Sequence, residues 1–341
     1  MAEARCAKLR VVYDNHDISA SISPYVVSAT FTDNAHGKAD SVSITVEDRD
    51  YLWQGSWKPS KGATLKVWID CTNWYGNGQD VTMYCGSFEI DGFSFDSGTG
   101  GDRFAIKGVS ANVKNSLRRE QSSRSWENAS IRLVARELAK RAEMDVVYEA
   151  ADVMLDRVDQ VNEGDLGFLK KLAEQNGMSL KVAESSLIFF DGAKFDARPA
   201  TVTLQRGDSA ISSVRMSDGI SEVYKSCEVS YHDPATKEDL HYKYTPEGAP
   251  TTGQTLKINS RVKTLSEAMK LAKNKLRQKN KDECKGSVSV MGDPRLRGSA
   301  VIALKGYLNF SGNYFVESAT HSIDDSGGYT TSCSIRKTLS Y

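Results

Sequence analysis

Apolar and polar side chains alternate along most of residues 1–120. The period is two, which is typical of half-buried β-strands, and the alternating segments are "LRVVYD", "SVSITVED", "ATLKVWID", "SFEIDGFSF" and "RFAIKGVSA". Between them lie stretches rich in Gly, Asn, Asp and Pro, such as "DNAHGKAD", "KPSKG" and "YGNGQD", and these residues favour chain reversals. We therefore predict an all-β domain over residues 1–120.

Helical spacing replaces this alternation over residues 121–199. A first amphipathic helix is predicted to begin near Asn128 and to bury one stripe of side chains, namely Ile131, Val134, Ala135, Leu138 and Ala142. A second is predicted to begin at Asn162 and to end at Gly177, a left-handed cap, and to bury Leu166, Leu169, Leu172 and Ala173. The strand-like "MSLKVA" and "SLIFFDG" follow, so we predict a small α/β module.

Residues 200–341 return to alternation with one helical interruption. The strand-like segments are "TVTLQR", "SSVRMS", "CEVSYHD", "LHYKYT", "GSAVIALKG", "GNYFVESATHS" and "YTTSCSIRK". Thr264 and Glu267 form a T-x-x-E capping box, followed by an apolar stripe of Leu265, Ala268, Met269, Ala272 and Leu276. We predict a second mostly β domain with a helix at about 264–282 and a hairpin turn at "DPATKED".

The two β regions share a short internal pattern. "GATLKVWI" precedes "GSFEIDGFSF" in the first region, and "GSAVIALKG" precedes "GNYFVESATH" in the second. Both second segments fit Gly-x-aromatic-x-(Ile/Val)-acidic, in which the acidic residue is Asp91 or Glu317. The pattern indicates a duplication. The predicted fold is therefore α+β and mostly β, with two related tube-like β-barrel domains flanking the α/β module.

Charge and cysteine content argue against several function classes. The chain has 44 basic and 44 acidic residues, so no net field attracts nucleic acid or an anionic membrane. The sequence shows neither a signal-peptide core nor an apolar run of membrane-spanning length, and we expect no membrane anchor. Six scattered cysteines lack a C-x-x-C pair, and five histidines lack helical metal spacing. We therefore expect reduced thiols and no metal or cofactor.

Two sets of side chains carry candidate chemistry in the first region. Glu89, Asp91 and Asp96 lie close together on a predicted strand, and paired carboxylates can hydrolyse a glycan. We favour solvent-facing strand residues, because no nucleophile and base accompany them. The second set is a group of aromatic side chains, which can stack on a carbohydrate. Burial in a core or in a subunit contact is the favoured alternative. The set comprises Trp53, Trp57, Trp68, Trp74 and Tyr75, and its loop "NWYGNG" is the expected intersubunit contact.

Three other features have a structural interpretation that we favour. The basic run from Lys270 to Lys285 is expected to be a solvated helix face instead of a nucleic-acid contact, because acidic residues interrupt it. The glycines of "DSGTGGD" predict a hairpin tip and not a phosphate loop. His232 and His241 are expected to be polar residues at a hairpin turn. No residue is assigned a catalytic, cofactor-binding or metal-binding role.

The ordered set of motifs resembles one known family. The segment "DQVNEGDLGFLKKLAEQNGMSLKVAESSLIFFD" is similar to the E-S-D-x-x-F-L-x-x-L-A-x-x-x-G signature of the hub domain in contractile-tail baseplate hubs and VgrG spike proteins. The flanking strands resemble the first and second barrels of the phage late control protein D family, in the family's order. VgrG proteins continue into a long β-helical needle, whereas this sequence ends at Tyr341, so a separate spike is expected.

The resemblance implies a non-enzymatic, structural function in the tail baseplate of a virion, after synthesis in the bacterial host cytoplasm. Family hubs are homotrimers, in which two barrels per chain give a pseudo-sixfold ring. The implied partners are the hexameric tail tube protein on one face, a separate trimeric tail spike protein on the other, other baseplate proteins and, as a further option, the tape measure protein. Specific nucleic-acid binding is not expected. Two alternatives stay open, namely a tail-associated cell-wall hydrolase or carbohydrate-binding module, and the hub of a secretion-system spike.

Overall fold

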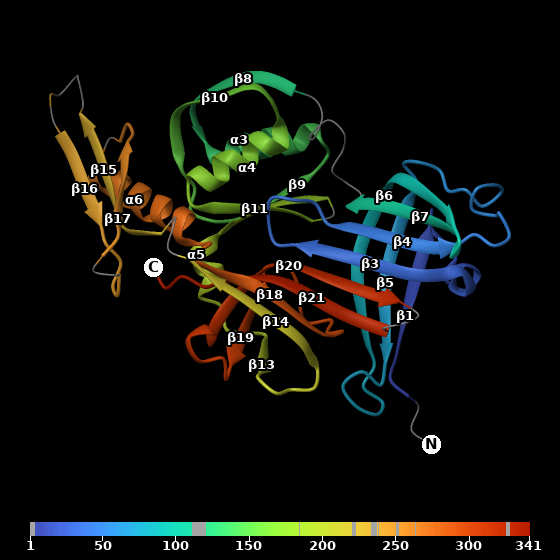
Figure 1. Ribbon diagram of the computed structural model, residues 1–341. Helices are drawn as coiled ribbons and strands as arrows, with labels where there is room; N and C mark the ends of the chain where they lie inside the picture. The colour runs from blue at the N-terminus through green and yellow to red at the C-terminus, as the bar shows by residue number, and fades with distance from the viewer. Residues whose placement is uncertain are drawn as a thin grey trace.

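One long sheet dominates the structure, which is a computed structural model. It describes residues 4–110, 121–183, 185–219, 223–232, 237, 239–249, 252–262, 264–324 and 328–341. The sheet has 13 strands in the order β14-β18-β21-β20-β3-β4-β7-β6-β5-β1-β2, with β13 and β19 attached beside β20. It curls around two separate clusters of buried side chains. Three smaller sheets and the longer helices lie beside it, as Figure 1 shows. The chain is mostly β, as the sequence predicts.

The strands before residue 111 form what we call the first β unit. They are β1 (Cys6–Tyr13), β2 (His16–Asp17), β3 (Val26–Asn34), β4 (Ser41–Glu47), β5 (Thr64–Thr72), β6 (Val81–Gly98) and β7 (Gly101–Ser110), with short turns α1 (Ser19–Ile22) and η1 (Ser23–Tyr25). The predicted alternation is clear in β5, where Leu65, Val67 and Ile69 are buried and their neighbours are half exposed. Burial of each such side chain stabilises the fold by about 1.5–3 kcal/mol. The predicted hairpin tip joins β6 to β7, which pair up to Gly98 and Gly101.

The C-terminal part of the chain contributes the second β unit. Its elements are β13 (Val202–Gln205), β14 (Ile211–Asp218), β18 (Cys284–Met291), β19 (Val301–Lys305), β20 (Gly312–Asp324) and β21 (Gly328–Lys337), with the turn η2 (Leu308–Phe310). These strands enclose their own core, in which Tyr314, Val316 and Ile335 are fully buried.

The two β units have the same strand connectivity. Taken in chain order, β1, β3, β4, β5, β6 and β7 correspond to β13, β14, β18, β19, β20 and β21. The pairs β5·β6, β6·β7, β7·β4 and β4·β3 are antiparallel, and so are β19·β20, β20·β21, β21·β18 and β18·β14. The outermost pair differs, since β1·β5 is antiparallel and β13·β19 is parallel. The predicted duplication is therefore present in the topology.

Local backbone features repeat as well. A register shift between Ile90 and Gly92 bulges β6 at Asp91, and a shift between Val316 and Ser318 bulges β20 at Glu317. Just before β5, Gly62 donates its N–H to the Ile90 carbonyl over 2.9 Å with φ 84°. Just before β19, Ser299 donates to Val316 over 2.9 Å with φ 76°. The shared motif therefore encodes the same bulge in both units.

The middle module lies between the two β units in the chain and is drawn above them in Figure 1. Its elements are β8 (Gln121–Ser130), α3 (Ile131–Arg141), β9 (Asp145–Glu149), β10 (Met154–Gly164), α4 (Asp165–Gln175), β11 (Met178–Ala183), β12 (Ser186–Asp191) and α5 (Gly192–Asp196). Helices α3 and α4 share a core with both of the module's sheets. The predicted stripes are buried there, except that Leu166 is only partly buried.

Both helices of the middle module begin later than the sequence predicts. Helix α3 is capped by Ser130, whose hydroxyl accepts from the Leu133 N–H over 3.2 Å, and not by Asn128. Helix α4 begins at Asp165 instead of Asn162. The reason is that β8 and β10 pair with each other up to these points. Asn128 and Asn162 therefore belong to paired strands, although their local capping preference favours a helix start. The C-terminal prediction is confirmed, since Gly177 has φ 74° directly after the cap residue of α4.

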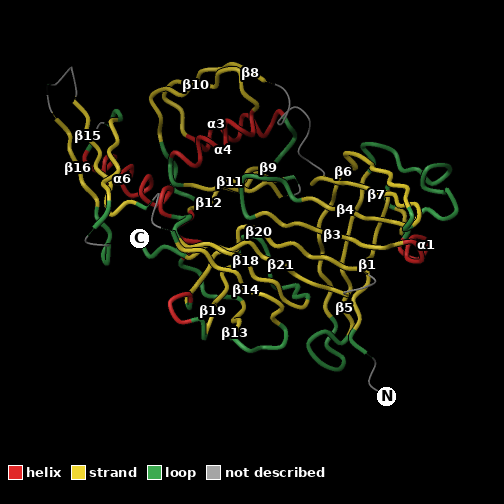
Figure 2. Tube along the Cα trace, in the orientation of Figure 1, coloured by secondary structure: helices red, strands yellow, loops and turns green. Residues whose placement is uncertain are grey.

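A third element set, the inserted unit, interrupts the second β unit between β14 and β18. It consists of β15 (Tyr224–His232), β16 (Asp239–Tyr244), β17 (Gln254–Asn259) and α6 (Leu265–Asn280), and it projects to one side (Figures 1 and 2). The capping box is confirmed, because the Thr264 hydroxyl accepts from the Glu267 N–H over 3.2 Å. Strands β15 and β16 form the expected hairpin, although most of its turn lies outside the described residues.

The predicted apolar stripe of α6 is only partly correct. Ala268, Ala272 and Leu276 are buried against β15 and β16, whereas Leu265 and Met269 are exposed. Helix α6 packs on a narrow sheet, which buries one row of its side chains and leaves the adjacent row exposed to solvent. Among the described residues, no helix has the length and apolar character needed to cross a membrane.

Candidate assembly surfaces

The two β units contact each other through one antiparallel strand pair, β3·β20. Residues 28–34 of β3 lie opposite residues 318–324 of β20, so one hydrogen-bonded sheet runs across the junction. On one face the hydroxyl oxygens of Thr30 and Ser322 lie 3.5 Å apart, and those of Thr32 and Thr320 lie 3.3 Å apart. Cross-strand hydroxyl pairs of this kind add modestly to the stability of a sheet.

The other face of this junction is buried and centres on His321. The ring of Phe31 stacks on His321 with centroids 6.0 Å apart. The Leu296 carbonyl lies 2.9 Å from Nε2, and because a carbonyl only accepts, Nε2 donates. Nδ1 therefore accepts, and the Tyr329 hydroxyl lies 2.7 Å from it. Burial lowers the pKa of His321 to about 4, so the ring is neutral at pH 7.

Asp33 connects three parts of the molecule beside this histidine. Its carboxylate lies 2.6 Å from Nζ of Lys181 in the middle module and 3.8 Å from Nη1 of Arg297 in the second β unit. Asp33 itself is buried. A buried carboxylate needs such partners, because an unpaired charge in a low-dielectric interior is costly. The pair therefore fixes the middle module against the junction of the β units.

The loop after β5 makes a second contact between the two β units. Trp74 is 5% exposed and donates its indole N–H to the Gly292 carbonyl over 2.7 Å. The Tyr75 hydroxyl donates to Asp293 over 2.8 Å, and burial raises the pKa of Tyr75. The expectation that "NWYGNG" is an intersubunit contact does not hold for Trp74, which is buried within the chain, whereas Tyr75 keeps 42% of its surface exposed. The surface they cover belongs to the same chain, more than 200 residues away.

Asp196 organises the meeting point of α5, α6 and β21. Its side chain is fully buried and accepts from Arg277 over 2.7 Å and from Arg336 over 2.9 Å. The Leu339 N–H also donates to it over 3.2 Å. No local pattern in the sequence predicts this cluster, because its members are distant in the chain. Arg277 belongs to the basic run that is predicted to be a solvated helix face, but its side chain is only 14% exposed.

Among the open edges of the long sheet, two matter for assembly, and neither has a partner strand within the described residues. Strand β14 pairs with β18 alone, which leaves its other edge open. Residues 92–98 of β6 pair with β7, but their other edge extends beyond the end of β5. Phe95 on this second edge is 45% exposed. Open edges present unpaired N–H and C=O groups, which makes them docking sites for another strand.

The candidate carboxylates do not form a catalytic pair in the structure. Glu89 is half buried, whereas Asp91 and Asp96 are exposed on β6. Asp91 occupies the bulge, which separates it in register from the other two. Within the described part of the chain, His, Cys, Asp and Glu side chains do not gather in groups of three or more that could hold a metal ion.

The tryptophans divide between core and surface. Trp53, Trp74 and Trp126 are buried, and Trp57 is 41% exposed beside Trp53, with ring centroids 5.6 Å apart. All six cysteines are free thiols, and five of them are buried.

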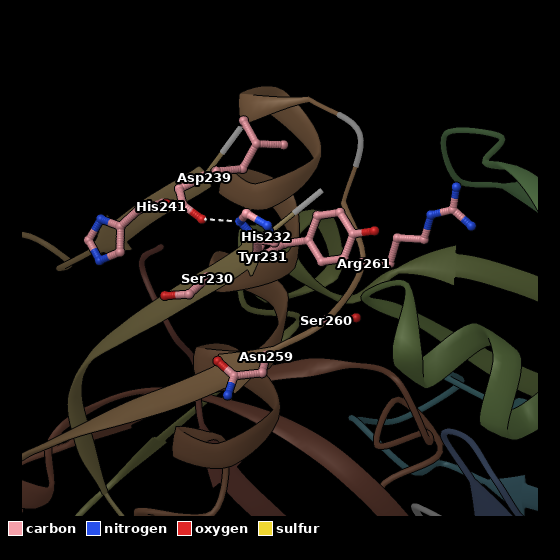
Figure 3. A pocket seen from close by; sticks show the side chains of 9 residues that line it. Ser230, Tyr231, His232, Asp239, His241, Asn259, Ser260 and Arg261 are labelled. Atoms are coloured by element: carbon pink, nitrogen blue, oxygen red, sulfur yellow. Dashed lines mark hydrogen bonds and ion pairs between the residues drawn. The ribbon is translucent and has the colours of Figure 1, made fainter. Parts of the chain in front are cut away.

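A pocket of about 620 Å³ lies on the inserted unit at the β15–β16 hairpin (Figure 3). Nδ1 of His232 lies 2.7 Å from Asp239, and Nε2 of His241 lies 3.1 Å from Glu228. Both histidines are more than half exposed, so these pairs contribute little to stability. The described lining also includes Ser230, Asn259 and Arg261, together with the apolar parts of Tyr231 and Leu240.

Comparison with known proteins assigns the chain to a family. The model of the family described as phage tail baseplate hub (GPD) matches residues 113–327, which is more than half of the chain. The chain belongs to this baseplate hub family. The resemblance found in the sequence is confirmed.

Individual relatives agree with this assignment. The probable baseplate hub protein of Escherichia phage 186 is 28% identical over 180 residues, which cover 52% of this chain and 43% of that protein. Its counterpart in Escherichia phage P2 is 29% identical over 182 residues, covering 52% and 44%. The aligned part therefore spans less than half the length of these curated relatives.

Solved structures show the same fold at low sequence identity. A tail protein from Neisseria meningitidis MC58 has a TM-score of 0.72 at 14% identity, covering 97% of this chain and 96% of that one. The 43 kDa tail protein of prophage MuSo2 from Shewanella oneidensis has a TM-score of 0.71 at 14% identity, covering 96% and 98%. The E. coli c3393 protein, a component of the type VI secretion system, has a TM-score of 0.56 at 10% identity, covering 91% and 73%.

Proposed function

We propose that this chain is the structural hub of a contractile phage tail, or of a phage-tail-like particle, and that it acts as a homotrimer in the tail baseplate of the virion. The observation that carries the proposal is the repeated β unit within a family of baseplate hubs. Three copies with two equivalent units each present six similar units around one axis. Such a ring offers sixfold contacts on one face while the assembly remains threefold.

The proposed partners follow from this symmetry. A hexameric tail tube protein contacts the six-unit face, and a separate trimeric spike contacts the other face. The middle module and the inserted unit, which lie outside the repeat, are the surfaces proposed for other baseplate proteins, including the tape measure. We assign no catalytic, cofactor-binding or metal-binding residue and no specific nucleic-acid contact.

Native mass measured by light scattering tests the proposal. We expect three times the chain mass of 37.5 kDa, either for the protein alone or after co-expression with the spike and tube proteins of the same particle. A chain that remains monomeric in the presence of both partners contradicts the proposal.

A turnover assay separates this function from that of a cell-wall hydrolase. We expect purified trimer to release no soluble fragments from peptidoglycan, and we expect the Glu89→Gln variant to behave as the unaltered chain does. Release of fragments that is lost in Glu89→Gln or Asp96→Asn would establish the hydrolase instead. A hub of a secretion-system spike shares this fold, and co-purification with a tube protein of a phage tail distinguishes the two settings.

We also propose that the chain comprises three domains, over residues 1–120, 121–199 and 200–341. The first β unit, the middle module and the second β unit each have their own cluster of buried side chains, which supports these boundaries. Limited proteolysis is expected to cut first near residues 120 and 199. Early cleavage inside β3 or β20 would contradict the division.

A further inference from the structure

The contact between the two β units has two sides, and each side has a counterpart elsewhere in the chain. The first β unit contributes β3 and the loop after β5, while the second contributes β20 and the connection between β18 and β19. By the strand equivalence, the second unit also carries the counterpart of the first side, namely β14 and the loop after β19. The first unit carries the counterpart of the second side, namely β6 and the connection between β4 and β5.

The pairing registers fix this correspondence residue by residue. Phe93 and Ala319 each lie two residues after the shared bulge. From Phe93, the pairs β6·β7, β7·β4 and β4·β3 lead through Ile106 and Ile44 to Ala29. From Ala319, the equivalent pairs lead through Cys333 and Val288 to Val214. Ala29 in β3 and Val214 in β14 are therefore equivalent positions.

We propose that β14 of one copy pairs antiparallel with β6 of the next copy, in the register that β3 and β20 use within the chain. Residues 213–218 then lie opposite residues 98–93 of the neighbour. This inference rests on the proposed homotrimer and specifies its interface. The occupant of the open edges of β14 and β6 is a second copy of this chain, because the contact already made inside one copy is repeated between copies.

Charge complementarity supports this register. Within the chain, Thr30 lies opposite Ser322 and Thr32 lies opposite Thr320. The equivalent intersubunit pairs are Arg215 with Asp96 and Ser217 with Ser94. Arg215 and Asp96 are both exposed in the single chain, and opposite charges directly across an antiparallel pair are stabilising. A shift by one residue would remove this match and turn every side chain to the other face.

Apolar surface supports the same contact on the core-facing side. Phe31 lies opposite His321 in the chain, where their rings stack. The equivalent pair between copies is Met216 with Phe95, and Phe95 is exposed in the single chain. Strand pairing would bury both side chains against each other, which removes an apolar edge from water.

The loops complete the interface. Within the chain, Trp74 after β5 docks on the connection after β18. The equivalent loop after β19 presents Leu308, which is 84% exposed with φ 54°. The equivalent connection after β4 presents Tyr51 and Trp57, which are 68% and 41% exposed. The left-handed backbone at Leu308 costs free energy and holds its apolar side chain in solvent. We propose that Tyr51 and Trp57 of the neighbouring copy cover this side chain.

A charge swap tests the proposed pair. We expect Arg215→Asp and Asp96→Arg each to weaken the trimer, so that the protein concentration at which it dissociates rises at least tenfold. The reason is that each change places like charges opposite each other. The double variant is expected to return this concentration to within about threefold of the unaltered value. The control is Lys107→Asp, which changes an exposed lysine of β7 away from both edges and is expected to leave assembly unchanged. No recovery in the double variant would contradict the register.

Disulfide trapping tests the register independently. Opposite residues of antiparallel strands have Cα atoms at a distance that a disulfide can span. We expect Ser94→Cys with Ser217→Cys, in a Cys6→Ser background, to give covalent dimers and trimers under oxidising conditions. Ser94→Cys with Asp218→Cys is the matched control, because the one-residue shift points its thiols to opposite faces.

The possible outcomes separate the interface from the proposed function. A trimer that shows neither trapping nor sensitivity to the charge changes contradicts the strand pairing and leaves the trimeric hub intact. A chain that stays monomeric with tube and spike proteins present contradicts both. Trapping in the shifted control instead of the proposed pair would show that the edges meet in a different register.

Discussion

At the scale of single residues, Asp196 is a fully buried charge that connects distant parts of the chain. It forms ion pairs with Arg277 and Arg336, whose side chains are 14% and 7% exposed. We predict that Asp196→Asn lowers the free energy of unfolding by about 3–5 kcal/mol, because removal of one partner leaves charges buried without compensation. Urea unfolding followed by circular dichroism measures this loss. The exposed Glu247→Gln is the control and is expected to change stability by less than about 0.5 kcal/mol.

His321 makes stability depend on pH in a defined direction. Burial lowers its folded-state pKa to about 4, below the ordinary value of 6.5, and the same holds for His36. The unfolded chain therefore binds more protons between pH 6.5 and 4, so stability is complete above pH 6.5 and falls as the pH drops towards 4. Burial raises the pKa of Asp40 to about 6, which offsets part of this loss.

A variant isolates the contribution of His321. We predict that His321→Gln flattens the slope of unfolding free energy against pH by up to about 1.4 kcal/mol per pH unit between pH 6.5 and 4, the value for one proton. The slope is compared among variants, so an overall loss of stability does not affect the result. The matched control is His16→Gln, in the exposed strand β2. An unaltered slope in His321→Gln would show that this histidine is not the group that titrates.

At the scale of elements, the sequence predicts those features of helices and strands that are set by residues close together in the chain. Periodicity identifies the strands, the buried stripe of α3 and the capping box of α6, because each is encoded within a few residues. Periodicity fails at the starts of α3 and α4, where pairing with a partner strand determines the first helical residue. It also fails at Met269, where the width of the covering sheet determines which side chains are buried. Such partners lie far away in the chain, so no local pattern contains them.

The duplicated bulge can be tested by exchanging its residues. Ser299 holds a left-handed φ of 76° where the first β unit has Gly62 at 84°, and this conformation costs a residue with a side chain about 1–2 kcal/mol. We predict that Ser299→Gly raises the free energy of unfolding by about 0.5–1 kcal/mol and that Gly62→Ser lowers it by about 1 kcal/mol. Thermal unfolding by calorimetry measures both changes, and effects of the same sign would contradict the equivalence.

At the scale of the whole molecule, the repeated motif predicts two related units but not how they join. The β3·β20 pair, Asp33 with its two cations and the docking of Trp74 all connect residues more than 100 positions apart. In the sequence, Trp74 sits in a glycine-rich loop and has the character of an exposed aromatic. Only the folded chain brings the Gly292 carbonyl to its indole nitrogen, which explains why no local pattern predicts that Trp74 is buried within the chain.

The contact of Trp74 with Gly292 and Tyr329 is expected to stabilise the junction of the two β units. Trp74→Ala removes the hydrogen bond to Gly292 and the ring contact with Tyr329, whose centroid lies 5.2 Å away, and is expected to cost about 3–5 kcal/mol. Hydrogen exchange followed by mass spectrometry should show faster exchange in residues 292–297 and in the β3·β20 pair, while the middle module keeps its protection. The exposed Trp57→Ala is the control and should leave exchange at the junction unchanged in a single copy. If Trp74→Ala speeds exchange only within its own loop, the strand pair alone holds the units together, and the equivalent loop at Leu308 would then be dispensable between copies as well.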